Sequence, residues 1–153
     1  LALLNGLPWR CECVGSLDYA VSHLPTLRLL AVLGHTGCGA VSATVDGYLE
    51  PAGYLRVTAN LPLRAIVDSL VAAVHAADRA LRACHGDDVA GCSGYRSALV
   101  DLAVVLNAAV AADALRTLFA ARLGDTLGVA FGVYADVLEP GPVRVGDELV
   151  LGS

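Results

Sequence analysis

The sequence is poor in charged and aromatic residues and contains no methionine. Only 16% of its 153 residues are charged and 5% are aromatic, whereas 56% are hydrophobic. So thin a polar surface suggests that a partner subunit covers part of the apolar surface, and we expect a homo-oligomer. Because a natural chain should begin with Met, its absence suggests that the N-terminus is cut.

Positive charge is equally scarce, and the hydrophobic runs are short. Ten Lys and Arg residues are scattered along a chain of net charge −5, which predicts no nucleic-acid partner. The apolar stretch Leu99–Ala112 is interrupted by Asp101 and Asn107 and is shorter than the ~20 residues that span a bilayer. The start, LALLNGLPW, lacks the basic segment and cleavage site of a secretory signal. We therefore expect a soluble protein with no membrane association.

The length and the cysteine content narrow the class further. A chain of 153 residues is the size of one domain, so we expect residues 1–153 to form a single domain. Five Cys residues, an odd number without the spacing of a disulfide framework, favour reduced thiols and metal ligands. Reduced thiols are typical of the cytoplasm, which is the expected location.

The first third of the chain alternates between helical and strand patterns. VGSLDYAVSH predicts a short amphipathic helix over Val14–His23, with Gly and Ser at its start. The apolar run LRLLAVL at Leu27–Leu33, closed by Gly34, is typical of a strand buried on both faces of a parallel sheet. A glycine turn follows, and Gly39–Leu49 has a helical pattern that Glu50–Gly53 breaks. This order predicts an α/β fold, a mainly parallel β-sheet flanked by helices.

The middle of the chain predicts a long helix and a polar connection. Leu61–Arg82 carries an apolar stripe at helical spacing, and Asp78 is among the charged residues that fall off this stripe. The connection Cys84–Gly94 contains Cys84, His85 and Cys92 at a spacing that suits zinc poorly. We interpret these three as exposed residues without a function, with a disulfide or an incidental metal site as the alternative.

The last third of the chain predicts a buried helix and a β-rich tail. Tyr95–Leu123 shows helical periodicity over an apolar segment that should be mostly buried. Val129–Val137 and Val143–Leu151 are rich in strand-forming residues and predict an edge strand or a hairpin. We assign no role to the tail over residues 137–153.

The glycine turn carries the chemistry. His35 and Cys38 lie three positions apart directly after the predicted strand, and imidazole and thiolate are two of the side chains that zinc prefers. Gly34, Gly37 and Gly39 allow a tight bend and a close approach of the backbone to an ion. The end of a parallel strand that opens into a helix is also where α/β folds bind ligands. His35 and Cys38 are therefore the candidate metal ligands.

The residues around this turn resemble a known family. SLDYAVSHLPTLRLLAVLGHTGCGAV at Ser16–Val41 is similar, nearly residue for residue, to the zinc-binding segment of β-class carbonic anhydrases. Tyr95–Asn107 resembles the family helix beside the site, and FGVYADV at Phe131–Val137 resembles a late strand. The resemblance implies Zn²⁺ bound by His35 and Cys38 as the second and third protein ligands, reversible hydration of CO2 to bicarbonate and a proton, and a dimer that buries the apolar helices.

The resemblance also implies residues that this sequence lacks. The family's remaining ligand is a Cys in an earlier Cys-x-Asp-x-Arg motif whose Asp and Arg orient the attacking group, and no such motif occurs here. The catalytic dyad is therefore not identified, and two readings stay open: a chain without the family's N-terminal strand and helices, or a degenerate homologue that is non-catalytic and acts by association. Cys11 and Cys13 lie close before His35, and a rearranged chain could bring them to the metal. Carbonyl sulfide or carbon disulfide are alternative substrates.

Overall fold

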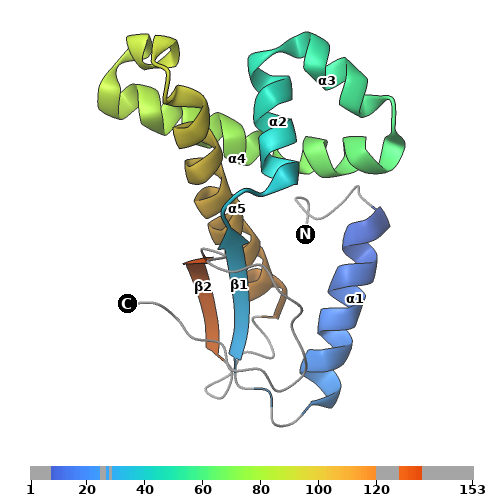
Figure 1. Ribbon diagram of the computed structural model, residues 1–153. Helices are drawn as coiled ribbons and strands as arrows, with labels where there is room; N and C mark the ends of the chain where they lie inside the picture. The colour runs from blue at the N-terminus through green and yellow to red at the C-terminus, as the bar shows by residue number, and fades with distance from the viewer. Residues whose placement is uncertain (1–7, 25–26, 28, 120–127, 136–153) are drawn as a thin grey trace.

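The computed structural model describes residues 8–24, 27, 29–119 and 128–135 of the chain. Their secondary structure consists of five α-helices, one short 3-10 helix and two strands (Figure 1). In chain order these are α1 (Pro8–His23), β1 (Leu29–His35), α2 (Gly39–Leu49), α3 (Pro51–Thr58), α4 (Leu61–His85), η1 (Asp87–Gly91), α5 (Tyr95–Phe119) and β2 (Gly128–Ala135).

The predicted fold class, a mainly parallel sheet flanked by helices, is wrong for the part of the chain that the structure describes. Helices contain most of these residues, and the sheet there has two strands, β1 and β2. The two strands are parallel, with Leu29 opposite Gly128 and His35 opposite Ala135, and the register shifts between Val32 and Leu33. The physical reason is that the long segment between the strands repeats its apolar residues at helical spacing, so its helices pack on one another.

Several element boundaries differ from the predicted ones. Helix α1 begins at Pro8, where a proline suits the first turn, rather than at the predicted Val14, and it ends at His23 as predicted. The strand continues through Gly34 to His35. Helix α2 has the predicted bounds, but the following break is shorter than expected because Pro51 already starts α3. The predicted strand Val143–Leu151 lies outside the described residues.

Strand β1 is not buried on both faces as predicted. Residues Ala31, Leu33 and His35 are exposed, whereas Val32 and Gly34 are partly covered, which is the alternation of a strand with one open face. Leu33 is 48% exposed. Helix α5 covers one face of the strand, and the described residues leave the other face to solvent.

The hydrophobic core lies where α2, α4 and α5 meet. Its fully buried side chains include Val45 from α2, Val74 from α4 and Leu99 from α5. Asn60 starts α4 by accepting a hydrogen bond from the backbone N–H of Leu63 over 3.2 Å, which satisfies one of the free amides of a helix N-terminus. The predicted long helices at 61–82 and from Tyr95 are therefore confirmed as core elements.

Helix α5 is central, and it is also the one described helix that is long and apolar enough to cross a membrane by length and composition. It packs against α2 and α4 on one part of its length and against β1 and β2 on another (Figure 1). The core helix of a globular protein has the same apolar composition, because it too is shielded from water on several sides. Helix α5 packs against both helices and strands, but only 33% of its apolar stretch is buried, less than the mostly buried helix that the sequence predicted.

Helix α1 differs from the others because it packs against none of the other described helices and strands (Figure 1). Its Tyr19 is 64% exposed, and Leu24 directly after the helix is 50% exposed. The Tyr19 ring stacks on His23 at a centroid distance of 4.0 Å, a contact within the helix itself. The other described helices and strands thus leave Tyr19 and Leu24 exposed, whereas Leu17 and Val21 are partly covered.

The close approach of β1 to α5 depends on Gly34. A Cβ atom at this position would lie 2.8 Å from Cγ1 of Val104 and 3.7 Å from Cβ of Ala108. A β-branched valine in a helix has one favoured rotamer, so its methyl group cannot swing away easily. Only glycine lets the strand lie this close to α5.

Replacing Gly34 with Ala should lower the free energy of unfolding by about 1–3 kcal/mol, because the added methyl group overpacks the contact with Val104. Urea denaturation followed by circular dichroism measures the loss. Gly39→Ala is the matched control, since no atom lies within 4 Å of a Cβ there. The double variant Gly34→Ala/Val104→Ala should recover part of the lost stability, and an equal loss in the Gly34 and Gly39 variants would contradict the overpacking explanation.

Candidate metal centre

The two candidate ligands lie on either side of one tight turn between β1 and α2. His35 is the last residue of β1, and Cys38 is the residue that precedes the first turn of α2. Gly37 between them has φ +63°, a left-handed conformation that glycine adopts without strain. The turn therefore brings an imidazole at a strand end and a thiol at a helix start into one short loop.

The hydrogen bond of His35 determines which ring nitrogen is free. Its Nδ1 lies 2.9 Å from the backbone carbonyl oxygen of Thr36. A carbonyl oxygen only accepts, so Nδ1 is the protonated nitrogen that donates, and the neutral ring has its lone pair on Nε2. The side chain is exposed at the end of the strand. His35 thus offers Nε2 to a metal ion, with its ring oriented by a backbone carbonyl in the manner of metal-binding histidines.

Cys38 forms no disulfide, so its thiol is free, and its backbone is hydrogen-bonded into the first turn of α2. Its carbonyl oxygen accepts a 2.9 Å hydrogen bond from the N–H of Ser42, and its side chain makes no capping hydrogen bond to the helix. The residue is half-buried and packs against the hydrophobic core. Cys38 thus places a sulfur atom, a donor that zinc prefers, at the start of α2.

The donors fit zinc by their chemistry, but the set is incomplete. Zinc takes four ligands, three or four of them from the protein. Among the described residues, no group of three or more His, Cys, Asp and Glu side chains lies close enough to hold a metal ion. Cys11 and Cys13 belong to α1, which packs against no other described element, and their side chains lie outside the described part. Within the described residues the turn therefore brings together two candidate ligands, His35 and Cys38.

A buried carboxylate that the sequence did not single out lies in the hydrophobic core. Asp78 was expected off the apolar stripe of α4, yet it is only 7% exposed. Its carboxylate accepts hydrogen bonds from Tyr48 of α2 over 2.9 Å, from Arg82 of α4 over 2.7 Å and from Tyr95 of α5. Asp78 therefore joins the three core helices. Only the tertiary contacts reveal this role, because Tyr48 and Tyr95 are distant from Asp78 in the sequence.

The surroundings of Asp78 keep it ionised. Burial alone would raise its pKa, but the hydrogen bonds from Tyr95, Arg82 and Tyr48 outweigh burial and hold the pKa below its ordinary value. Burial and the bond to Asp78 raise the pKa of Tyr95 and of Tyr48, so both phenols stay protonated donors. The cluster has donors matched to acceptors and no group poised to exchange a proton near neutral pH.

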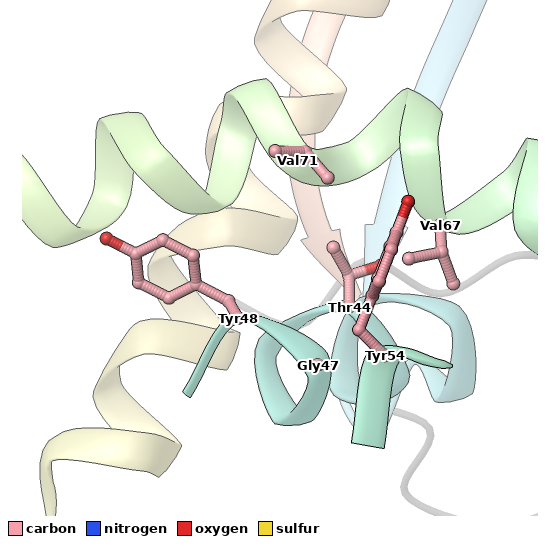
Figure 2. A pocket seen from close by; sticks show the side chains of 6 residues that line it. All are labelled: Thr44, Gly47, Tyr48, Tyr54, Val67 and Val71. Atoms are coloured by element: carbon pink, nitrogen blue, oxygen red, sulfur yellow. The ribbon is translucent and has the colours of Figure 1, made fainter. Parts of the chain in front are cut away.

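A shallow groove of about 280 Å³ lies between α2, α3 and α4, separate from the candidate ligands (Figure 2). Val67, Val71 and Gly47 contribute apolar surface, and the rings of Tyr48 and Tyr54 form part of the walls. Each phenol hydroxyl is already engaged, since Tyr48 donates to Asp78 and Tyr54 donates to Asp68 over 2.7 Å. The groove contains none of the predicted metal ligands.

The remaining histidines and cysteines have ordinary surroundings. Cys84 and Cys92 are free and exposed on either side of η1, and with His85 they form no metal-binding group within the described chain. His23 contacts the carbonyl oxygen of Tyr19 in its own helix at 2.9 Å. His75 packs edge-on against Tyr48 with ring centroids 4.8 Å apart.

The end of β1 and the start of α2 thus bring one imidazole and one thiol to a single turn, and both side-chain types are zinc donors. The family model described as carbonic anhydrase matches residues 6–117, which include both ligands and most of α5. The chain belongs to the carbonic anhydrase family, and this confirms the resemblance drawn from the GHTGCGAV segment. No curated protein and no solved structure matches the chain.

Replacing Asp78 with Asn should lower the free energy of unfolding at pH 7 by about 1.5–3 kcal/mol, the range for hydrogen bonds to a charged group. Because the folded-state pKa of Asp78 is depressed, its stabilisation is complete above the ordinary value of 3.8 and is lost as the pH falls through the lower folded-state pKa. The gap between parent and variant should therefore narrow below about pH 4, as measured by urea denaturation.

The control for this prediction is Asp88→Asn, a change at an exposed carboxylate on η1. It should leave stability nearly unchanged at both pH values. A gap between the parent and the Asp78 variant that stays constant from pH 7 to pH 2.5 would show that the charge of Asp78 is not what stabilises the fold.

Proposed function

We propose that the protein is a zinc-dependent carbonic anhydrase that catalyses the reversible hydration of CO2 to bicarbonate and a proton. The observation that carries the proposal is the turn itself, because His35 has Nε2 free and Cys38 has a free thiol at the start of α2. Membership of the carbonic anhydrase family supports the same activity.

In this proposal each residue of the turn has a separate role. His35 would bind zinc through Nε2, with the carbonyl of Thr36 fixing its ring through Nδ1, and Cys38 would bind through Sγ. When bound, zinc acts as a Lewis acid that makes water a strong nucleophile near neutral pH. The further donor comes from outside the described residues or from a partner subunit. Water exclusion and proton transfer would likewise depend on residues beyond this turn.

The second candidate is a non-catalytic homologue that binds zinc or acts by association. The observation that favours it is the absence of a Cys-x-Asp-x-Arg segment from the sequence, because that segment supplies a ligand and the orienting carboxylate in the resembled enzymes. The two candidates share His35 and Cys38 and differ in turnover of CO2.

The purified protein should contain close to one zinc ion per chain, because the turn supplies two donors and the proposed site a third. Metal analysis by mass spectrometry measures the content. The variants His35→Ala and Cys38→Ala should each lose nearly all of the metal, since removal of one ligand from an already minimal set leaves too few donors.

Cys92→Ser is the matched control for Cys38→Ala, because Cys92 is another free thiol and lies far along the chain on the polar connection. It should retain the zinc. A parent protein without zinc, or with zinc that survives loss of His35 and Cys38, would refute the proposed site. Hydration of CO2 followed by stopped flow then separates the candidates, because the non-catalytic homologue binds zinc without accelerating the reaction.

Self-association is part of the proposal, and the exposed apolar surface supports it. The open face of β1 exposes Leu33, and α1 exposes Tyr19 and packs against no other described element. Covering such side chains in a dimer would remove apolar surface from water, which is the main driving force of association. We propose that the other binding partners are CO2 and bicarbonate rather than nucleic acid or lipid.

Replacing Leu33 with Glu should shift the protein from dimer to monomer, because a charge on the open face of β1 would have to be buried in the dimer. Analytical ultracentrifugation over a range of concentrations measures the shift. Leu55→Glu is the control, a change of the same kind at a residue of α3 that is 71% exposed. A parent that is monomeric at all concentrations, or a dimer that both variants leave intact, would argue against this interface.

A further inference from the structure

We propose that Asp46 and Tyr48 are positioning residues for Cys38, because their polar contacts fix the rotation of α2, the helix that starts at this ligand. The metal-binding part of this inference rests on the function proposed above. The positioning itself is a property of the metal-free fold. It is carried by two contacts at the C-terminal half of α2, both of which end on α4 or α5.

The apolar contacts of α2 do not determine its rotation closely. Val41, Thr44 and Val45 are buried against the core, but the hydrophobic effect is non-directional and tolerates small rotations of a helix. At the start of the helix, the side chain of Cys38 makes no capping hydrogen bond that would fix the direction of the N-terminal end of α2.

The directional contacts lie at the other end of the helix. Arg96 of α5 donates to both carboxylate oxygens of Asp46, from Nε over 2.6 Å and from a terminal nitrogen over 2.9 Å. Both side chains are about half exposed, at 52% and 54%, so the ion pair adds little stability. Two parallel hydrogen bonds to a planar group nevertheless define an orientation, which is what a bidentate pair contributes.

Tyr48 supplies the second directional contact. Its hydroxyl donates to Asp78 of α4, whose other hydrogen bonds come from Tyr95 and Arg82. Tyr95 and Arg96 are consecutive residues in the first turn of α5. Asp46 and Tyr48 lie two residues apart and so project from different sides of α2. Together they fix both the rotation of the helix and its place along its axis.

A small rotation of α2 would matter to a metal site. A side-chain atom lies roughly 5 Å from the helix axis, so a rotation of about 10° moves it by about 0.9 Å. Metal–ligand distances tolerate only about 0.2 Å. The position of His35 depends on α5 as well, because β1, the strand that carries His35, packs through Gly34 against Val104 of α5. Helix α5 thus aligns the strand that bears one ligand with the helix that bears the other.

The test begins with the metal-free protein and a pair of isosteric variants. Tyr48→Phe removes the hydroxyl that reaches Asp78 and keeps the ring, and Tyr54→Phe removes the same group from a 2.7 Å bond to Asp68 between α3 and α4. Amide hydrogen exchange at Ser42, whose N–H bonds to the carbonyl of Cys38, reports the first turn of α2. Urea denaturation gives the global stability of each variant.

Tyr48→Phe should speed exchange at Ser42 about fivefold, the effect of losing one hydrogen bond, beyond any change in global stability. Tyr54→Phe should not. Asp46→Asn, at an exposed position that does not threaten folding, should act in the same direction as Tyr48→Phe. Equal exchange at Ser42 in the parent, Tyr48→Phe and Asp46→Asn proteins, after correction for stability, would overturn the positioning role.

A titration with Co²⁺, followed through its visible and thiolate charge-transfer bands, extends the test to the metal. Affinity should fall about tenfold in Tyr48→Phe and Asp46→Asn, the effect of removing a supporting contact, and stay unchanged in Tyr54→Phe. If the parent protein gives no such bands, the proposed metal site is contradicted. The positioning role is not, because hydrogen exchange in the metal-free protein tests it separately. Parent-like affinity and spectra in both α2 variants would overturn positioning even if stability falls.

Discussion

The close packing of α5 against β1 and α2 is the constraint on which the rest of the structure depends. Near its start α5 forms the ion pair with Asp46 and the hydrogen bond to Asp78, and farther along Val104 presses against the backbone of Gly34. These contacts align a strand end with a helix start, and the turn between them carries His35 and Cys38. The candidate metal centre is a product of that alignment.

The chemistry at the turn follows from ordinary properties of the backbone. A carbonyl oxygen next to His35 selects the protonated nitrogen of the ring and leaves the other for a metal, and Cys38 offers a free thiol at the start of α2. In the proposed function the turn supplies two donors and residues elsewhere supply the rest. Membership of the carbonic anhydrase family rests on the match over residues 6–117, which includes this turn.

Asp78 shows how a charged residue can serve as a core residue. Its position in α4 places it among apolar neighbours, where an isolated carboxylate would be costly. Donors from three helices compensate for the lost water, so the carboxylate stays ionised and connects α4 to α2 and α5 through directional hydrogen bonds. The exposed ion pair between Asp46 and Arg96 also orients α2 but adds little stability.

Local patterns in the sequence determined the candidate ligands, the glycine turn, the bounds of α2 and the existence of α4 and α5, because each depends on residues within a few positions of one another. Only the tertiary structure decided that helices outweigh the sheet, that one face of β1 is open, and that Asp78 is buried. Those features depend on which distant segments meet: Tyr48, Asp78 and Tyr95 are far apart in the chain, and no periodicity within one segment encodes their contact. Gly34 shows both kinds of information, because the sequence shows a glycine at the end of the apolar run, whereas its position within β1 and its contact with Val104 appear only in the structure.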